Sequence, residues 1–269
     1  MSAVVNLSAV YVRVFTGDGC QGNKAAVVIH HETLSASVMQ SFAARYAMPA
    51  TAFVSPQKNM TFDIRWFSPT EEIQRCGHGT LAAAYHLFEQ HSEVVKLTFC
   101  SSIDRAIVVE RTKSGIAHKP HMMSLALHFP IEPPQRAPVP SALSHILPAP
   151  PSELYRNDNA YFAIYPDASV IHDLKVDHQA LPLLHPYALI VTAPGDEQDF
   201  VYRYFWYGIN GGEDAVTGSA QTGLAPLWAT KLAKNQLVAR QLSKEGGVVY
   251  AQLVANHVRI GAEVEYDIV

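Results

Sequence analysis

Short runs in which apolar residues alternate with polar ones, or in which β-branched and aromatic residues gather, recur along most of the chain. In the first half, these runs predict strands over residues 9–15, 25–29, 52–54, 62–67, 94–99, 106–110 and 123–129. In the second half, they predict strands over residues 160–165, 187–192, 200–205, 247–253 and 257–264. The first two runs flank a glycine-rich turn and predict an opening hairpin. Strands therefore dominate the expected secondary structure.

Three stretches carry helix signals instead. Residues 33–48 place apolar side chains at helical spacing, and Pro49 ends the stretch. Residues 75–80 read RCGHGT and precede an alanine-rich run over residues 81–88, which predicts a tight loop leading into a buried helix. Residues 217–219 read TGS and also precede an apolar, helix-like run. One long helix is therefore expected at the centre of each half.

The similarity of these two loops predicts an internal repeat. Cys76 and Thr217 occupy matching places in them and lie 217 − 76 = 141 residues apart, about half of the 269-residue chain. Residues 130–140 are rich in proline, which is typical of an extended connector. We therefore predict an α+β protein of two pseudo-symmetric domains, residues 1–129 and 130–269. Each would be a curved, mostly antiparallel sheet around a central helix, with the last strand able to pair with the first domain.

The start of each central helix is a candidate anion site. The first N–H groups of a helix have no partner within it, and the aligned peptide dipoles add partial positive charge, so a carboxylate can bind there. If the halves repeat, both helix starts face one cleft and share a small carboxylate. Cys76 and His78 flank the first turn and could exchange protons with that ligand. The residues expected to contact it are Gly77, Gly79, Thr80, Gly218, Ser219 and Ala220. The alternative is a pair of glycine-capped core helices.

The composition favours a cytoplasmic protein that handles small molecules. Lys and Arg number 20 against 24 Asp and Glu, so the net charge is −4, too near neutral to indicate nucleic acid or an anionic membrane as a partner. Three cysteines at no metal-binding spacing indicate reduced thiols, and no stretch is typical of a signal peptide or a membrane span. His30 and His31, like His118 with His121, lack an acidic partner at ligand spacing, and no glycine-rich phosphate motif is present. We therefore expect neither a metal nor a cofactor.

Four pieces of the chain, in the same order, resemble the PhzF-like family of phenazine-biosynthesis isomerases, on the diaminopimelate epimerase fold. The pieces lie within residues 14–28, 52–54, 65–84 and 213–220. The resemblance implies two domains related by a pseudo-twofold axis, a homodimer and an active site that shifts a proton without a cofactor. In that family the proton moves between carbons of a small carboxylated substrate, in phenazine biosynthesis a dihydro-hydroxyanthranilate.

The resemblance also assigns roles to individual residues. It implies that His78 and Asp214 help to position substrate and proton, and that Ser219 donates from its hydroxyl. The family usually has a glutamate directly before the Thr-x-Phe-Val run, where it is the main general acid and base, but this chain has Ala50. Loss of such a base costs about 10²–10⁴ in rate. The candidate replacements are Cys76, Asp214 and Glu72, although Glu72 could instead brace the loop.

Two other interpretations stay open. The CGHGT run is also similar to the first catalytic loop of proline racemases and hydroxyproline-type dehydratases, in which a thiolate removes the α-proton. Thr217 stands where the second cysteine of a racemase would be, so a one-base isomerase or dehydratase that uses Cys76 is the enzymatic alternative. A degenerate family member that only binds a small carboxylate is the non-enzymatic one. Each of these residues could instead have a purely structural role. Cys76 and His78 would then pack in the core, Asp214 would cap the second helix, and the Ser219 hydroxyl would make a local hydrogen bond.

Overall fold

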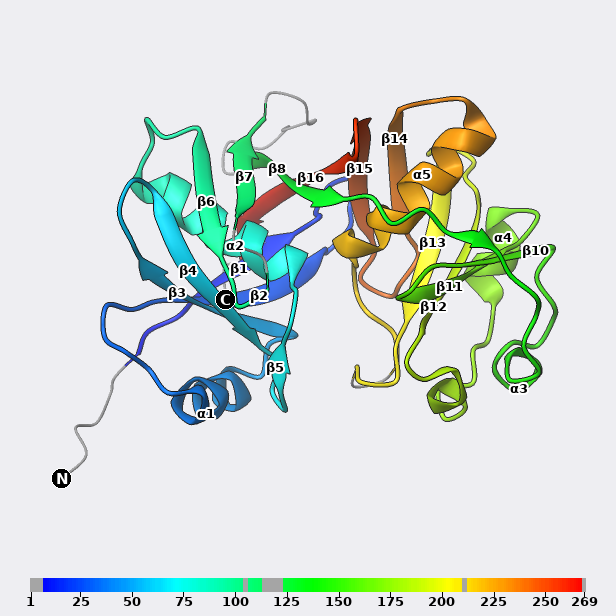
Figure 1. Ribbon diagram of the computed structural model, residues 1–269, viewed down its shortest axis with the longest axis horizontal. Coiled ribbons are helices and arrows are strands. Elements are labelled where there is room, and N and C mark those ends of the chain that lie inside the picture. Colours follow the sequence, from blue (N-terminus) through cyan, green and yellow to red (C-terminus); the bar gives the residue numbers. More distant parts are fainter. Residues whose placement is uncertain (1–6, 104–105, 113–122, 210–211, 268–269) are drawn as a thin grey trace. The chain divides into compact units, whose positions relative to one another are not determined.

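The computed structural model describes residues 7–103, 106–112, 123–209 and 212–267 (Figure 1). Its contacts divide the chain into two compact units. Unit 1 comprises Met1–Gly17, Asn23–His128 and Gly261–Val269, and unit 2 comprises Asp18–Gly22 and Phe129–Ile260. The chain therefore leaves unit 1 near the predicted boundary at residue 129 but returns to it for its last residues.

Unit 1 is built from strands that close around a helix. In sheet order they are β1 (Val10–Val14), β2 (Asn23–Ile29), β3 (Ala50–Pro56), β4 (Thr61–Phe67), β6 (Lys96–Cys100), β7 (Ile107–Arg111), β8 (Met123–Pro130) and β16 (His257–Tyr266), and β16 pairs back with β1. The short β5 (Glu72–Ile73) pairs with β4. The β2–β3 and β4–β6 pairs are parallel, whereas β1–β2, β3–β4, β6–β7 and β7–β8 are antiparallel. The antiparallel β1–β2 pair confirms the predicted hairpin.

The helix inside these strands is α2 (Gly77–Gln90), which Figure 1 shows enclosed by the ribbon of unit 1. It packs against β1, β2 and β3. Leu81, Ala82, Ala83 and Ala84 are wholly buried. Small alanine side chains allow strands to approach the helix from several sides, and they also have the highest helix propensity. The run that predicted a buried helix therefore also explains how the sheet can wrap it.

A second helix, α1 (Ala36–Tyr46), lies against the other side of the β2–β4 strands. Its buried residues Met39 and Ala43 pack in a cluster with Phe53 and Phe67. Ser35 caps its start, since the Ser35 Oγ accepts a hydrogen bond from the Val38 N–H at 3.3 Å. The helix ends before Pro49, as the sequence predicts.

Unit 2 contains a second, open set of strands. From the part of β16 that belongs to this unit, the order is β15 (Gly247–Val254), β14 (Gln236–Gln241), β13 (Phe200–Phe205), β12 (Ala188–Pro194), β11 (Ala160–Ile164), β10 (Glu153–Arg156) and β9 (Gln135–Arg136). The pairs β11–β12 and β13–β14 are parallel. The helical segments are α3 (Leu143–Ile146), α4 (Ala168–Asp173), η1 (Leu181–Leu184), η2 (Gly218–Ala220) and α5 (Gln221–Leu232).

The long helix of unit 2, α5, packs against β14 and β15. Its Trp228 stacks on Phe200 of β13, with ring centroids 5.4 Å apart and an angle of 7° between the planes. The Trp228 indole N–H donates to Thr192 Oγ1 of β12 at 3.0 Å. Figure 1 shows α5 alongside β13, β14 and β15. As in unit 1, one buried helix carries a polar loop at its start.

Several elements of unit 2 were not expected from the sequence. The sequence did not predict β14, because only two of its three buried residues, Leu237 and Ala239, are apolar. The third buried residue is Gln241. β9 lies in the segment that predicted an extended connector, because proline-rich backbone is compatible with a short edge strand. The short helices α3 and α4 carry too few periodic positions to stand out in the sequence.

Close packing of α5 gives a stability prediction. A Cβ on Gly223 would lie 2.3 Å from the Cζ of the buried Phe162. We expect Gly223→Ala to lower the free energy of unfolding by about 1–3 kcal/mol, because the overlap outweighs the gain of about 1 kcal/mol in helix propensity. Urea unfolding measures the change, with Thr230→Ala on the exposed face of α5 as the control. A Gly223→Ala protein as stable as the parent would contradict the packing described.

Candidate functional site

The loop before α2 is held together by Cys76. This residue has an extended backbone (φ −137°, ψ 100°) and caps the helix, since its Sγ accepts the Gly79 N–H at 3.4 Å. The Thr80 N–H and the Thr80 Oγ1 both donate to the Cys76 carbonyl oxygen, at 3.1 and 2.7 Å. The thiol is 5% exposed. Cys76 is therefore both a structural cap and a nearly buried thiol.

Gly79 is required by the packing of this loop. A Cβ at this position would lie 2.9 Å from Trp66 Cδ1 and 3.1 Å from Cys76 Sγ. Any larger residue would displace the indole or the thiol. The glycine therefore fixes the position of the sulfur at the start of α2.

His78 lies next to the thiol. Its Nδ1 and Nε2 atoms are 3.5 and 3.8 Å from Cys76 Sγ. Although part of the side chain remains accessible, the surrounding protein desolvates the ring and lowers the pKa of His78 to about 4. The imidazole is thus neutral near pH 7 and only weakly basic.

Two N–H groups at the start of α2 are left for a ligand. Those of Gly79 and Thr80 are occupied by Cys76, whereas those of Gly77 and His78 have no hydrogen bond within the described residues. Adjacent free N–H groups at a helix start are the usual components of a carboxylate site. The predicted contact at Gly77 is therefore compatible with the geometry, but Gly79 and Thr80 would contribute only packing.

The loop before α5, in unit 2, is held by a different set of bonds. The Thr217 hydroxyl donates to Asp214 Oδ2 at 2.5 Å. Gln241 of β14 donates from Nε2 to the Asp214 carbonyl at 2.6 Å and accepts the Thr217 N–H on Oε1 at 2.8 Å. The hydroxyl of the buried Tyr202 donates to the Thr217 carbonyl at 3.2 Å. These contacts fix the Asp214 carboxylate relative to the start of the helix.

The charge of Asp214 lies close to two buried phenols. Burial, reinforced by the negative charge of Asp214, raises the pKa of both Tyr202 and Tyr204 well above the ordinary value. Both tyrosines therefore stay protonated and neutral. Neither phenol acts as a base at neutral pH.

The second helix start repeats a feature of the first. Thr217 is extended (φ −110°, ψ 93°), like Cys76, and the N–H groups of Gly218 and Ser219 have no hydrogen bond in the described ranges. These two residues are 141 positions after Gly77 and His78, the offset of the predicted repeat. The Ser219 hydroxyl also makes no hydrogen bond there. Each unit therefore presents one pair of free N–H groups at a helix start.

Two further positions bear on the missing base. Ala50 begins β3, pairs with Ala25 and is wholly buried, so no proton carrier stands at that place. Glu72 accepts two hydrogen bonds from Arg65, both at 2.7 Å, and these lower the pKa of the glutamate. A carboxylate held ionised by a bidentate guanidinium is a weak base. Glu72 therefore braces β5 against β4 rather than replacing the glutamate.

The predicted site residues fall into two groups. Cys76, His78 and Ala50 belong to unit 1, whereas Asp214 and Ser219 belong to unit 2. Within each unit the structure brings the residues of one loop together. That both loops serve one ligand stays a prediction.

Sequence reasoning missed the residues that support the two loops. Trp66 packs against Gly79, and Gln241 holds both ends of the Asp214–Thr217 segment. An inward-facing glutamine at the end of an alternating run was the available signal for Gln241. Nothing local in the sequence links Trp66 to a glycine 13 positions away.

No group of three or more His, Cys, Asp or Glu side chains that could hold a metal ion occurs in the described part of the chain. The helices of these residues include none that is long and apolar enough to cross a membrane.

Known proteins similar to this chain identify its family. Residues 12–260 match the PhzC-PhzF family, described as phenazine biosynthesis-like protein. An uncharacterized isomerase of Pseudomonas aeruginosa is 32% identical over 93% of this chain and 92% of its own length. A phenazine biosynthesis protein of the PhzF family from Enterococcus faecalis is 30% identical and superposes with a TM-score of 0.88 over 98% of both chains. A predicted epimerase from P. aeruginosa, 16% identical, shares the fold with a TM-score of 0.70 over 97% of this chain and 98% of its own.

The chain therefore belongs to the PhzF-like family of phenazine biosynthesis-like proteins, whose relatives include isomerases. This confirms the resemblance, the α+β epimerase-like fold class and the assignment to isomerases.

The pKa of His78 predicts how stability depends on pH. Because the folded pKa of about 4 is below the ordinary 6.5, the unfolded chain binds more protons between these values, so stability falls as pH decreases through this window. We expect His78→Asn to remove at most about 2 kcal/mol of the loss between pH 7 and pH 5. Urea unfolding at both values measures it, with the exposed His145→Asn as the control. An equal acid loss in His78→Asn and the parent would contradict the assignment.

Proposed function

We propose that this protein is a cofactor-independent isomerase that shifts a proton at a carbon atom of a small carboxylated substrate. The observation that carries the proposal is the helix start at η2. There, the two free N–H groups of Gly218 and Ser219 follow the Asp214 carboxylate, which Thr217 and Gln241 hold in place. Such a site supplies what removal of a proton from carbon requires, namely charge stabilisation and a group that can take the proton.

The chemistry follows from the charges involved. When a base removes a proton from the carbon next to a carboxylate or a conjugated double bond, negative charge spreads onto oxygen. Free N–H groups at a helix start stabilise that charge without rearrangement of solvent. Return of the proton to a different carbon gives an isomer, with no net gain or loss of atoms or electrons.

Asp214 is our first choice for the base. It is fixed by Thr217 and Gln241, lies one turn before the free N–H pair of η2, and stands within the second motif of the family. The substitution at Ala50 removes the usual family glutamate, so the substrate must be more acidic than one that depends on that residue. We therefore favour a substrate whose carbanion is strongly delocalised.

The geometry around Cys76 supports a second candidate, a one-base dehydratase or racemase-type reaction. Its Sγ accepts the Gly79 N–H and lies 3.5 Å from His78 Nδ1, so the sulfur is fixed between a helix N–H group and an imidazole. Thr217, the residue at the matching place in the other loop, cannot act as a second thiol. The alternative is therefore limited to one base.

We further propose that the protein acts in the cytoplasm as a homodimer and uses neither nucleic acid nor membrane as a partner. The near-neutral net charge of −4 and the three cysteines without metal spacing support the cytoplasmic small-molecule role. The homodimer rests on the family resemblance alone.

Deuterium exchange tests the proposal and separates the two bases. In D₂O, the parent should incorporate deuterium at carbon of a small activated carboxylate, measured by mass spectrometry. We expect Asp214→Asn to lower the exchange rate about 10²–10⁴-fold and Cys76→Ser to change it little. Cys20→Ser and Asp173→Asn are the matched controls.

The reverse pattern, in which Cys76→Ser abolishes exchange and Asp214→Asn does not, would establish the thiol as the base. If a small activated carboxylate binds but none that is tested exchanges a proton at carbon, the protein only binds its ligand and the proposed isomerisation is wrong.

Ala50→Glu tests whether the site keeps the family geometry. Burial would raise the pKa of the new carboxyl toward neutrality, where a base is most effective. We expect faster exchange on a dihydroaromatic carboxylate, measured as above, and no gain in Ala50→Gln, which has the same size without the charge. Equal rates in both variants, with both folded, would show that residue 50 does not face the reacting carbon.

A further inference from the structure

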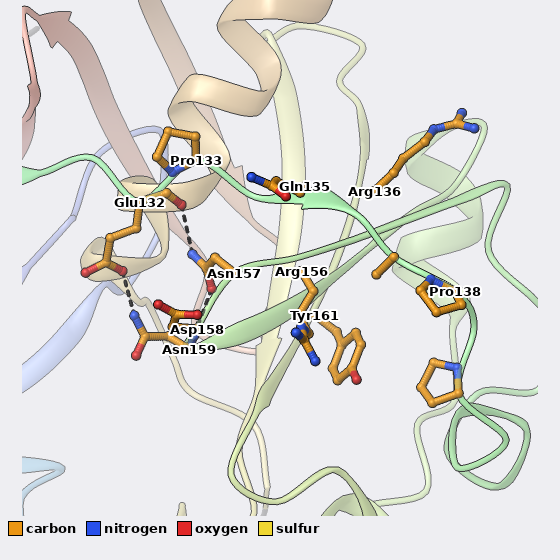
Figure 2. A pocket seen from close by; sticks show the side chains of 12 residues that line it. Glu132, Pro133, Gln135, Arg136, Pro138, Arg156, Asn157, Asp158, Asn159 and Tyr161 are labelled. Carbon is orange, nitrogen blue, oxygen red and sulfur yellow. Dashed lines mark hydrogen bonds between the residues drawn. The ribbon is translucent and has the colours of Figure 1, made fainter.

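Unit 2 contains a cavity of about 730 Å³ that is separate from the α5 loop residues described above. It lies between the proline-rich segment and the turn that joins β10 to β11 (Figure 2). The lining is contributed by Glu132, Gln135 and Pro138 on one side, and by Arg156, Asp158 and Tyr161 on the other. All of these residues belong to unit 2.

Most polar groups of this cavity are already occupied. The Glu132 carboxylate accepts hydrogen bonds from Asn159 Nδ2 at 2.6 Å and from Thr222 Oγ1 at 3.3 Å. Asn157 donates from Nδ2 to the Glu132 carbonyl at 2.9 Å and accepts the Ala160 N–H at 2.9 Å. Figure 2 shows these bonds along one wall. They make that wall rigid and leave few groups for a ligand.

Two arginines line the cavity, Arg136 and Arg156, and the guanidinium directed toward it is that of Arg156. Its position on β10 pairs with Gln135 on β9 and with Tyr161 on β11, so the three side chains share one face of the sheet. The guanidinium lies 5.0 Å from the ring centroid of Tyr187 and 6.0 Å from that of Tyr161. Stacking holds the plane of the guanidinium and leaves its N–H edges for an anion.

Arg136 differs in this respect. It pairs across the strands with Tyr155, one position from Arg156, so its side chain lies on the opposite face of the sheet. There it donates to Glu153 at 2.9 Å. Figure 2 shows its side chain directed away from Arg156.

The cavity also carries a negative charge that is not neutralised by an ion pair. Hydrogen bonding to Tyr161 and the neighbouring Tyr187 raise the pKa of the Arg156 guanidinium, and the charge of Asp158 adds a smaller effect in the same direction. Arg156 and Asp158 form no ion pair within the described residues. A dianion such as phosphate would meet this carboxylate as well as the Arg156 guanidinium. A ligand with one negative and one positive group would complement both charges.

The remaining wall is apolar. Pro133, Ala137, Pro138 and Pro140 line the cavity on the side of the connector. Proline rings are rigid, so an apolar group can pack against them without a large loss of side-chain freedom. A ligand for this cavity therefore combines a zwitterion with an apolar side chain.

We propose that this cavity binds a free apolar α-amino acid, with Arg156 holding the carboxylate, Asp158 holding the ammonium group and the prolines contacting the side chain. The site is independent of the proposed isomerase reaction, because it uses none of the residues of the two helix-start loops. A failure of the proposed function would leave it unchanged.

Titrations followed by amide NMR test the proposal on the intact chain. L-Leucine is compared with 4-methylpentanoate, which lacks the ammonium group, and with 3-methylbutylamine, which lacks the carboxylate. We expect leucine to shift the amides of Gln135, Asp158 and Tyr161, and each truncated probe to bind at least about tenfold more weakly. L-Proline and L-phenylalanine extend the panel.

Variants then assign the charges. Arg156→Gln should weaken leucine binding at least about tenfold, whereas Lys175→Gln, an exposed cation of unit 2 that does not line the cavity, should not change it. Asp158→Asn should weaken leucine binding but not that of 4-methylpentanoate. The same spectra show whether each variant is folded.

Three results would overturn the proposal. They are equal affinities for leucine and 4-methylpentanoate, leucine binding that persists in Arg156→Gln, and the absence of any shift at these amides with all three amino acids.

Discussion

The start of α2 is the constraint on which the first half of this molecule depends. A helix enclosed by strands must find partners for its first N–H groups without water, and here the thiol and carbonyl of Cys76 satisfy those of Gly79 and Thr80. Trp66 and Cys76 then leave room only for glycine at residue 79. What remains at the helix start is two free N–H groups beside a neutral histidine. The packing of the core and the chemistry of the loop are therefore the same set of contacts.

The loop before α5 also leaves two free N–H groups at a helix start, but different side chains hold it in place. The Asp214 carboxylate, the Thr217 hydroxyl and the Gln241 amide replace the thiol and its helix contacts, yet the free N–H groups fall at the same offset in the chain. Only the backbone arrangement is common to both loops, while their side chains differ in acid–base character. Ala50 itself carries no proton, and both candidate carboxylate sites are built without it.

The sequence predicts much of this because the strong signals are local. Alternation predicts most strands, the alanine-rich run predicts α2, and the two glycine loops predict the helix starts with their Cys76, His78 and Asp214. β14 and β9 were missed, since an inward glutamine and a proline-rich edge both resemble loop residues. Trp66 and Gln241 support the loops from distant strands, and their contacts depend on strand register, which no local pattern encodes. The lowered pKa of His78 likewise requires the surrounding core to be known.

In the proposed reaction, the helix starts would stabilise the planar, charge-delocalised carbanion of a carboxylate more strongly than its tetrahedral ground state. The most direct test is the ratio of dissociation constants for a planar carboxylate and its saturated counterpart of equal carbon number, beginning with benzoate and cyclohexanecarboxylate, by calorimetry. We expect the planar compound to bind at least about 10²-fold more tightly, as mimics of a transition state do. Equal affinities for the two compounds would contradict it.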